Sequence, residues 1–447
     1  MTGQPAISGP EQPAGTQVPA LAVGPRSGQV DETLSIVVSG LRAGQRVTVR
    51  AATRDGALVD WHSTADFVAA PDGTVDVGRD APAAGYPGVD PLGLLWAMRP
   101  TDPGRQVFFT KRRPTALKVT VSARAGGESI GEVGIERCFG GEHVLGRPTG
   151  DDLVGTLYHD DERRPAPAVL LLAGSDGGQL DHAAALLAGR GYAALALSYF
   201  GAEDLPPTLS HIDLGYFRRA VDWLLDQPEV DRSRPASVIG LSRGGELALQ
   251  LAALDARLHN VVAAAPSSLR QAGLTSNYTD YGQPAWELDG RALPFLKGRY
   301  NFGTFLSFAR TWLLARPMRQ RRAFERAMRD ADAVAAARIE VEAITGPVLL
   351  ISGADDRLWP SDVYAGQVER RLLAHGHPAE VVNLTYPGAG HFVSFPYALP
   401  GMPPMVSISP MSRLRIDFGG SAPANAAAAV DSWRRVLEFL GRHTSRS

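Results

Sequence analysis

The sequence predicts an α/β fold, a mostly parallel sheet with helices on both faces, preceded by a small all-β sandwich. Three observations predict this class. Between residues 30 and 136, apolar residues alternate with polar ones, as in antiparallel strands. After residue 138, short continuous apolar runs alternate with helix-length segments, as in parallel strands buried on both faces. At residues 235–251, a glycine-flanked serine stands between a predicted strand and a predicted helix.

The sandwich is predicted from four alternating runs with glycine-bearing turns between them. No helix-length amphipathic segment interrupts this region, so two sheets packed face to face would bury its apolar side chains. Trp61 and Phe67 are expected in that core. Residues 86–96 break the strand pattern and predict a loop that plugs against the neighbouring domain, or that faces substrate. The alternating apolar positions are Leu34, Ile36 and Val38; Val47, Val49 and Ala51; Val75 and Val77; and Leu117, Val119 and Val121.

The parallel sheet is predicted from apolar runs in the second part of the chain. A C-terminal helix at residues 424–440 is expected to cover it, with Val430, Trp433, Leu437 and Leu440 along one face. Further helices are expected from residue 183, at 216–225 and directly after Ser242. Strands are expected at 154–158, 168–172, 192–197, the run into Ser242, 259–265 and 348–352.

The composition excludes several classes of function. The 447 residues are 44% hydrophobic and 21% charged, with a net charge of −2 and no long basic run, which argues against nucleic acid or an anionic membrane as the main partner. Cys138 is the single cysteine, so it has no intramolecular disulfide partner and is expected to be a buried thiol. Residues 1–24, rich in Pro, Gly and Ala, predict a disordered tail without a targeting or spanning segment, and hence a cytoplasmic protein.

Ser242 is the candidate nucleophile. Gly240 and Gly244 flank it in the sequence Gly-Leu-Ser-Arg-Gly, and a sharp strand-to-helix turn needs glycine where a Cβ would clash. Such a turn lifts the serine clear of the sheet. The alternative is an ordinary serine in a tight structural turn.

A serine hydroxyl needs a general base, and the base needs an orienting carboxylate. His391, on a glycine-rich loop, is the candidate base. The apolar run at 348–352 delivers Asp355 and Asp356 to the sheet edge where Ser242 is expected. Asp356 is preferred because the fourth position of a Gly-x-x-Asp turn is the usual one for this carboxylate in the fold that the chain resembles, and Asp355 stays open as the alternative. The chain order Ser, Asp, His is that of an α/β-hydrolase.

Two backbone amides are candidates for binding the oxyanion of a tetrahedral intermediate. The amide of Arg243 begins the helix after Ser242, where the helix dipole assists it. The second donor is expected in the loop after the strand at 168–172, from Ser175 or, alternatively, Asp176. The glycines of that loop could equally serve only its turn.

These motifs, taken together, resemble the family of acyl-CoA thioesterases and bile acid-CoA:amino acid N-acyltransferases, from residue 25 onward. The resemblance implies an immunoglobulin-like sandwich at 25–140 and an α/β-hydrolase catalytic domain at 141–447. The residues that carry it are Asp31-Glu32, Gly40-Leu41, Trp61 with Ser63, 72–76, 88–96, Gly240-Leu241-Ser242-Arg243-Gly244-Gly245-Glu246, 353–356 with Trp359, and 386–391.

The resemblance also implies an activity. Family members similar to the N-acyltransferases carry cysteine at the nucleophile position, whereas members with serine are mostly thioesterases, and here Ser242 is serine. It therefore implies hydrolysis of an acyl-CoA or acyl-carrier thioester by Ser242, Asp356 and His391, without metal or organic cofactor. An acyltransferase using an amine or hydroxyl acceptor and a generic serine esterase are the alternatives. The oligomeric state is left open.

An insertion at about residues 268–338 lies outside the minimal sheet. As a lid, its aromatic residues would contact an acyl chain and its arginines would meet CoA phosphates. The alternative is that the aromatics pack the insertion onto the body and the arginines form a solvated helix face. The aromatics are Tyr278, Trp286, Phe295, Tyr300, Phe302, Phe305, Phe308 and Trp312, and the arginines are Arg316, Arg319, Arg321 and Arg322.

Overall fold

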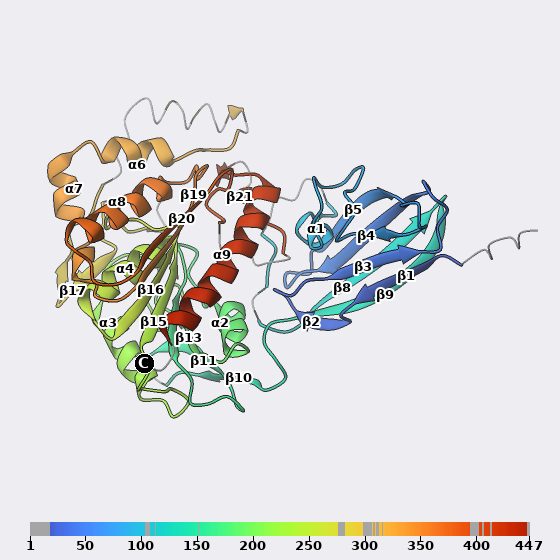
Figure 1. The fold of residues 1–447 in the computed structure, drawn as a ribbon. Coiled ribbons are helices and arrows are strands. Elements are labelled where there is room, and N and C mark those ends of the chain that lie inside the picture. The colour runs from blue at the N-terminus through green and yellow to red at the C-terminus, as the bar shows by residue number, and fades with distance from the viewer. Residues whose placement is uncertain are drawn as a thin grey trace, which may run out of the picture.

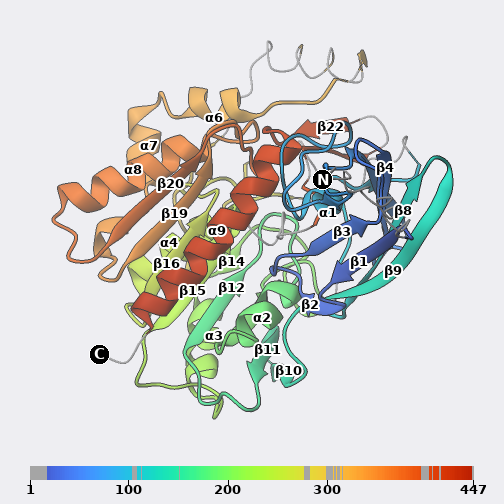
Figure 2. The ribbon, with the colours of Figure 1, turned by 45° about the vertical axis from the view of Figure 1, so that its right-hand side comes forward.

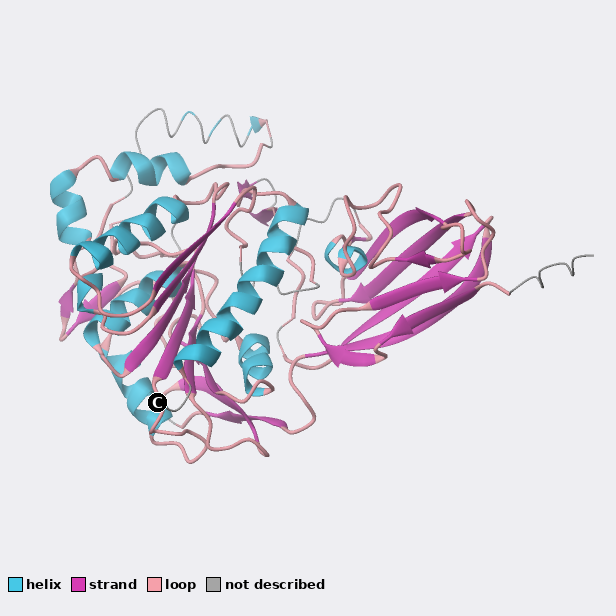
Figure 3. Ribbon diagram, viewed as in Figure 1, coloured by secondary structure: helices cyan, strands magenta, loops and turns pink. Residues whose placement is uncertain are grey.

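The computed structural model describes residues 18–102, 108–111, 113–150, 152–275, 282–297, 306, 309, 313–314, 316–393, 402–404, 406–411 and 414–444. Figure 1 shows two parts, an all-β sandwich and a larger body built on a twisted sheet. Figure 3 shows that helices accompany the strands of the body, while the sandwich is nearly all strand. The predicted fold class is confirmed.

The sandwich consists of a three-stranded sheet in the order β1-β3-β6 and a six-stranded sheet in the order β2-β9-β8-β4-β5-β7. Alternate residues of β4 and β5 are buried, Trp61 and Phe67 among them, as the sequence predicts. The strands are β1 (Ala20–Gly24), β2 (Ser27–Gln29), β3 (Ser35–Ser39), β4 (Arg46–Arg54), β5 (Asp60–Val68), β6 (Val75–Asp76), β7 (Arg99–Pro100), β8 (Leu117–Ala125) and β9 (Glu128–Cys138).

The body is built on an eight-stranded sheet in the order β10-β11-β13-β12-β15-β16-β19-β20. β10 and β11 pair antiparallel at one edge, and every pairing from β13 to β20 is parallel. The strands are β10 (Val144–Pro148), β11 (Val154–Asp160), β12 (Ala168–Leu172), β13 (Ala193–Ser198), β15 (Ala236–Leu241), β16 (Leu258–Ala264), β19 (Val348–Gly353) and β20 (Val381–Tyr386).

Helices cover both faces of this sheet. α2 (Asp181–Ala188) and α9 (Ala422–His443) pack on one face, and Figure 2 shows α9 running diagonally across it. α3 (Gly215–Leu225), α4 (Arg243–Leu254) and α8 (Ser361–Ala374) pack on the other. Residues of β12 alternate between the two apolar cores, with Val169 and Leu171 on the α9 side and Leu170 and Leu172 on the α4 side. Continuous apolar runs arise because both faces are buried.

Short elements, in part from the insertion, complete the body. β14 (Ile212–Asp213), β17 (Trp286–Leu288) and β18 (Arg291–Ala292) form a small sheet beside α3. α6 (Arg321–Ala327), α7 (Ala331–Ala337) and the 3-10 helix η1 (Val341–Ala343) follow it, and β21 (Ser407–Met411) pairs with β22 (Leu414–Asp417). The predicted lid aromatics Tyr278, Tyr300, Phe302, Phe305, Phe308 and Trp312 lie outside the described residues.

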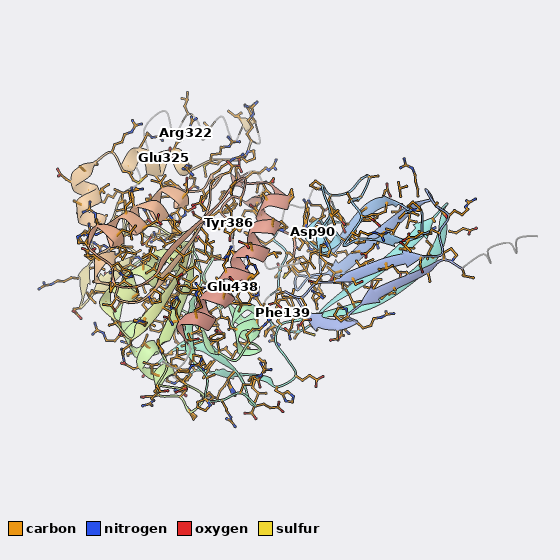
Figure 4. The ribbon with its side chains drawn as sticks, in the orientation of Figure 1. Asp90, Phe139, Arg322, Glu325, Tyr386 and Glu438 are labelled. Carbon is orange, nitrogen blue, oxygen red and sulfur yellow. The ribbon has the colours of Figure 1, made fainter. Side chains whose placement is uncertain are left out.

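The segment at 86–96 packs the sandwich against the body. Its end forms a short helix, α1 (Gly93–Trp96), where the sequence predicts only a loop. The carboxylate of Asp90, labelled in Figure 4, accepts hydrogen bonds from the amide of Leu92 at 2.8 Å and from the Trp96 indole at 2.7 Å. The whole helix is buried and contacts α9. This contact matches the prediction that residues 86–96 plug against the neighbouring domain.

A buried carboxylate of the sandwich binds two groups of the body. Asp31 Oδ2 accepts hydrogen bonds from Arg190 Nη2 and from Trp433 Nε1, each at 2.6 Å. The amide of Gly140 donates to Gln29 Oε1 at 2.9 Å in the same region. One apolar core continues from the sandwich into the α2 and α9 side of the sheet.

Three expectations from the sequence are wrong. Residues 20–24 of the predicted tail form β1, which pairs with β3, because Leu21 and Val23 alternate inward; residues 1–17 lie outside the described residues. Val430 is 44% exposed, because α9 turns a face rich in small residues such as Ala426 and Ala429 onto the sheet. Cys138 is half-buried rather than buried, at the end of β9, with its sulfur 3.5 Å from Ser27 Oγ.

Candidate active site

Ser242 lies at the tip of a strained turn between β15 and α4. Its φ of 57° and ψ of −116° are a conformation that L residues rarely adopt. A Cβ on Gly240 would lie 1.9 Å from the Gly244 carbonyl oxygen, and a Cβ on Gly244 would lie 2.3 Å from that of Leu172. Both positions therefore require glycine, as the sequence predicts. The turn is held by a hydrogen bond from the Ser242 amide to the Ala264 carbonyl at 2.8 Å.

The structure brings Ser242, His391 and Asp356 together. His391 Nε2 lies 2.9 Å from Ser242 Oγ, and His391 Nδ1 lies 2.8 Å from Asp356 Oδ2. All three residues are buried. Since an ionised carboxylate only accepts hydrogen bonds, Nδ1 carries the proton toward Asp356 and Nε2 is left to accept one from the serine hydroxyl.

Asp356, rather than Asp355, contacts the imidazole. Its Oδ2 also accepts from Ser361 Oγ at 2.6 Å, and its Oδ1 accepts from the amides of Leu358 and Trp359 at 3.0 and 3.3 Å. These donors satisfy a carboxylate that is fully shielded from solvent.

Asp355 points into a different set of contacts. It forms an ion pair with Arg357, with Oδ2 2.8 Å from Nη2, and accepts the amide of Gly420 at 3.1 Å. No hydrogen bond joins it to His391 among the described residues. Of the two carboxylates that the sequence leaves as alternatives, Asp356 is therefore the one in contact with His391.

The imidazole is held by groups that sequence reasoning missed. The His391 amide donates to the Phe418 carbonyl at 2.8 Å, and Asn425 Oδ1 of α9 accepts the Gly390 amide at 2.8 Å. The ring lies edge-on to Trp359, with the centroids 5.8 Å apart. A buried Asn on a helix otherwise rich in alanine was the available signal for Asn425.

The loop after β12 meets the N-terminus of α4. The close approach of Gly244 to the carbonyls of Leu172 and Ala173 brings the start of this loop next to the amide of Arg243, which belongs to the unpaired first turn of α4. Tyr199 Oη donates to the Ala173 carbonyl at 2.6 Å, and the Gly177 amide donates to the Gly174 carbonyl at 3.2 Å. Ser175 and Asp176 are exposed at the tip of this loop. The oxyanion donors stay a prediction.

The Arg243 side chain turns away from the serine into a buried polar cluster. Its Nη1 lies 2.8 Å from Glu246 Oε2, and its Nη2 donates to the Gln271 carbonyl at 3.2 Å. Trp286 Nε1 donates to Glu246 Oε1 at 2.7 Å. Burial raises the pKa of the Glu246 carboxyl, and the neighbouring Arg243 opposes that shift.

Trp286 lies in the body and is not part of an acyl-binding lid. It is buried against Tyr199 and Phe217, with ring centroids 6.0 and 6.4 Å away. For Trp286 this favours the alternative of packing the insertion onto the body. Phe295, the other described aromatic of the set, is half-buried.

Replacing Arg243 by methionine is expected to lower the free energy of unfolding by about 3 kcal/mol, because Glu246 would remain buried without its cation. Urea denaturation measures this as a lower midpoint. The double variant Arg243→Met/Glu246→Gln is expected to recover most of the loss, since a neutral amide can still accept from Trp286. Arg434→Met, which removes an exposed arginine of α9, is the control and is expected to change little. An unchanged midpoint for Arg243→Met would contradict the interpretation.

Two of the four arginines of the insertion form ion pairs with carboxylates among the described residues. Arg319 Nε lies 3.0 Å from Asp417 Oδ2. Arg321 forms ion pairs with Glu325 at 2.8 Å and Asp362 at 2.9 Å. Figure 4 labels Glu325 and the neighbouring Arg322 on α6, on the outer side of the body. These pairings match a structural role at least for Arg321.

A strained serine lies between β15 and α4, and the loops after β19 and β20 carry the carboxylate and the histidine. Together with the order of the strands, this arrangement defines an α/β-hydrolase fold. Family models agree and are more specific. Residues 31–148 match the acyl-CoA thioester hydrolase/BAAT N-terminal region, and residues 212–446 match the BAAT/acyl-CoA thioester hydrolase C-terminal region. The chain belongs to this family.

Curated relatives match along most of the chain. Mitochondrial acyl-coenzyme A thioesterase 2 of Mus musculus is 33% identical over 424 residues, which cover 92% of this chain and 86% of the relative. Acyl-coenzyme A thioesterase 1 of Homo sapiens is 33% identical over 428 residues, with 92% and 94% covered. The peroxisomal succinyl-coenzyme A thioesterase of Mus musculus is 32% identical over 427 residues, with the same coverage.

Two of these relatives are named for mitochondria and peroxisomes, so the predicted cytoplasmic location stays a prediction. Within the part of the chain that the structure describes, no helix has both the length and the apolarity needed to cross a bilayer.

Proposed function

We propose that this protein is an acyl-CoA thioesterase that works through an acyl-serine intermediate. The observation that carries the proposal is the hydrogen-bonded series Ser242, His391 and Asp356 in a chain of the acyl-CoA thioester hydrolase/BAAT family. The carboxylate orients the imidazole, and the imidazole is in contact with the hydroxyl that would attack.

In the first half-reaction, Ser242 Oγ bonds to the thioester carbonyl carbon while His391 Nε2 takes the hydroxyl proton. The amides of Arg243 and Ser175 are the proposed donors to the oxyanion. The C–S bond then breaks, and the leaving thiolate receives the proton from His391.

In the second half-reaction, a water molecule replaces the thiol. His391 accepts a proton from the water as its oxygen bonds to the acyl carbon, and the proton returns to Ser242 Oγ as the acid leaves. Water and an amine or hydroxyl acceptor compete for the same acyl-enzyme, so thioesterase and acyltransferase differ only in this step.

The test is to incubate the purified protein with a panel of acyl-CoAs, with and without amine and hydroxyl acceptors, and to follow thiol release and the acyl product by mass. Free acid formed without an acceptor is the expected result. Amide or ester formed only in the presence of an acceptor would identify an acyltransferase instead. Hydrolysis of simple oxygen esters without any turnover of thioesters would identify a general esterase.

A further inference from the structure

A large cleft lies between the sandwich and the body, outside the serine, histidine and aspartate series. Its volume is about 1110 Å³. The sandwich side is formed by residues 108–111 and 113–115. The body side includes residues 176–182, which follow β12 and begin α2, and residues of β10, β11 and β13 beside them. Figure 4 labels Phe139 where the two parts meet, and its ring centroid lies 5.5 Å from Nζ of Lys111, which lines the cleft. A space of this size exceeds what a small acyl group alone needs.

The cleft reaches both segments that flank the candidate active site. Asp176 and Gly177 directly follow Ser175, the proposed oxyanion donor. On the other side, the Phe108 ring centroid lies 5.8 Å from that of Phe392, the residue after His391. A thioester whose carbonyl lies at Ser242 could therefore extend one of its two arms into the cleft.

Cationic side chains line the sandwich side of the cleft. Lys111 is half-buried, its Nζ donates to Thr115 Oγ1 at 2.7 Å, and it lies 5.5 Å from the centroid of the Phe139 ring. Arg113 is exposed two residues further along. Neither forms an ion pair with a carboxylate in the described part of the chain. Burial lowers the pKa of Lys111, as expected for a cation that lacks an anionic partner.

The remaining ionisable groups of the cleft lie on the body side. They are Tyr158, Asp176, Asp181 and His182. Asp181 accepts a hydrogen bond from Tyr158 Oη at 3.1 Å, and burial raises the pKa of its carboxyl. The cleft thus has a cationic wall on the sandwich and a mixed wall on the body.

We propose that this cleft binds the nucleotide arm of coenzyme A, with Lys111 and Arg113 contacting its phosphates. This rests on the proposed function and assigns the phosphate site to the sandwich rather than to the insertion. Arginine and lysine bind phosphate oxygens by charge-assisted hydrogen bonds. Among the described residues these two cations form no ion pair, and the cleft they line also includes Asp176, the residue after Ser175, and Phe108, whose ring contacts Phe392. In the insertion, Arg319 and Arg321 are already paired.

The test compares two substrates that share an acyl group and a pantetheine arm but differ in phosphates. For Lys111→Ala/Arg113→Ala, KM for the acyl-CoA is expected to rise about tenfold or more with kcat unchanged. KM for the matching S-acyl-pantetheine, which has no phosphate, is expected to stay the same. Inhibition by adenosine 3′,5′-bisphosphate is expected to weaken in parallel.

Lys118→Ala/Arg124→Ala is the matched control, since it removes two exposed cations of the same sandwich outside the cleft. It is expected to leave both KM values unchanged. An unchanged KM for acyl-CoA in the cleft variant, or an equal rise for both substrates, would overturn the proposal. A rise in Arg319→Glu/Arg322→Glu but not in the cleft variant would move the phosphate site to the insertion.

Failure of the proposed function can be distinguished from failure of the proposed cleft site. If the native protein turns over no thioester, calorimetry with adenosine 3′,5′-bisphosphate still tests the cleft. Binding by the native protein that is lost in Lys111→Ala/Arg113→Ala would support the site, and absence of binding by the native protein would overturn it.

Discussion

Replacing Ser242 by alanine is expected to lower kcat for thioester hydrolysis by about 10⁴-fold or more. The substitution removes only the hydroxyl, whose oxygen lies 2.9 Å from His391 Nε2. Without it no acyl-enzyme can form, and only binding and oxyanion contacts remain. Steady-state release of thiol, together with mass detection of an acyl adduct on the native protein, measures the effect.

Ser175→Ala is the matched control for this variant. Ser175 is proposed to act through its backbone amide alone, and its side chain lies in an exposed loop, so its loss is expected to cost less than about threefold in kcat. If Ser242→Ala retained full activity while folding normally, the proposed nucleophile would be wrong.

Replacing Asp356 by asparagine is expected to lower kcat by about 10³- to 10⁴-fold. The carbonyl oxygen of the asparagine would still accept hydrogen bonds from the backbone amides of Leu358 and Trp359. Its NH₂ would, however, face Nδ1 of His391 and favour the tautomer with the proton on Nε2, where the base must accept. This kcat is measured with the acyl-CoA of the panel that the native protein turns over fastest.

Asp355→Asn provides the comparison. It weakens the ion pair with Arg357 and leaves the contact between His391 and Asp356 in place, so a fall of less than about tenfold is expected. The reverse ranking, with Asp355→Asn the more damaging change, would reassign the carboxylate.

The strand-to-helix turn at Ser242 was predictable because its signal is local. Gly240 and Gly244 are required by backbone contacts within the same motif or with the adjacent strand, and only glycine meets them. The approach of His391 and Asp356 was predictable for a related reason, since parallel strands bring the loops at their carboxyl ends to one edge of the sheet.

The buried cluster around Glu246 was not predictable in the same way. It joins Arg243, Gln271 and Trp286, which are brought together by the path of the insertion rather than by any repeat in the sequence. Residue type alone does not tell whether Trp286 belongs to a lid or to the body, and its contacts with Tyr199 and Phe217 place it in the body. The face of α9 was misjudged at Val430 because alanines carry little hydrophobic signal although they pack closely on the sheet.

The contact of Asp31 with Arg190 and Trp433 has a consequence for how the chain unfolds. One bond crosses from the sandwich to Trp433 of α9, and the other crosses to Arg190, just after α2. One apolar core includes residues of both parts. Separating the parts would break both hydrogen bonds of a carboxylate whose side chain is only 2% exposed, and it would uncover that apolar core to water. We therefore expect the sandwich and the body to unfold as one cooperative unit, which calorimetry would show as a single heat-absorption transition.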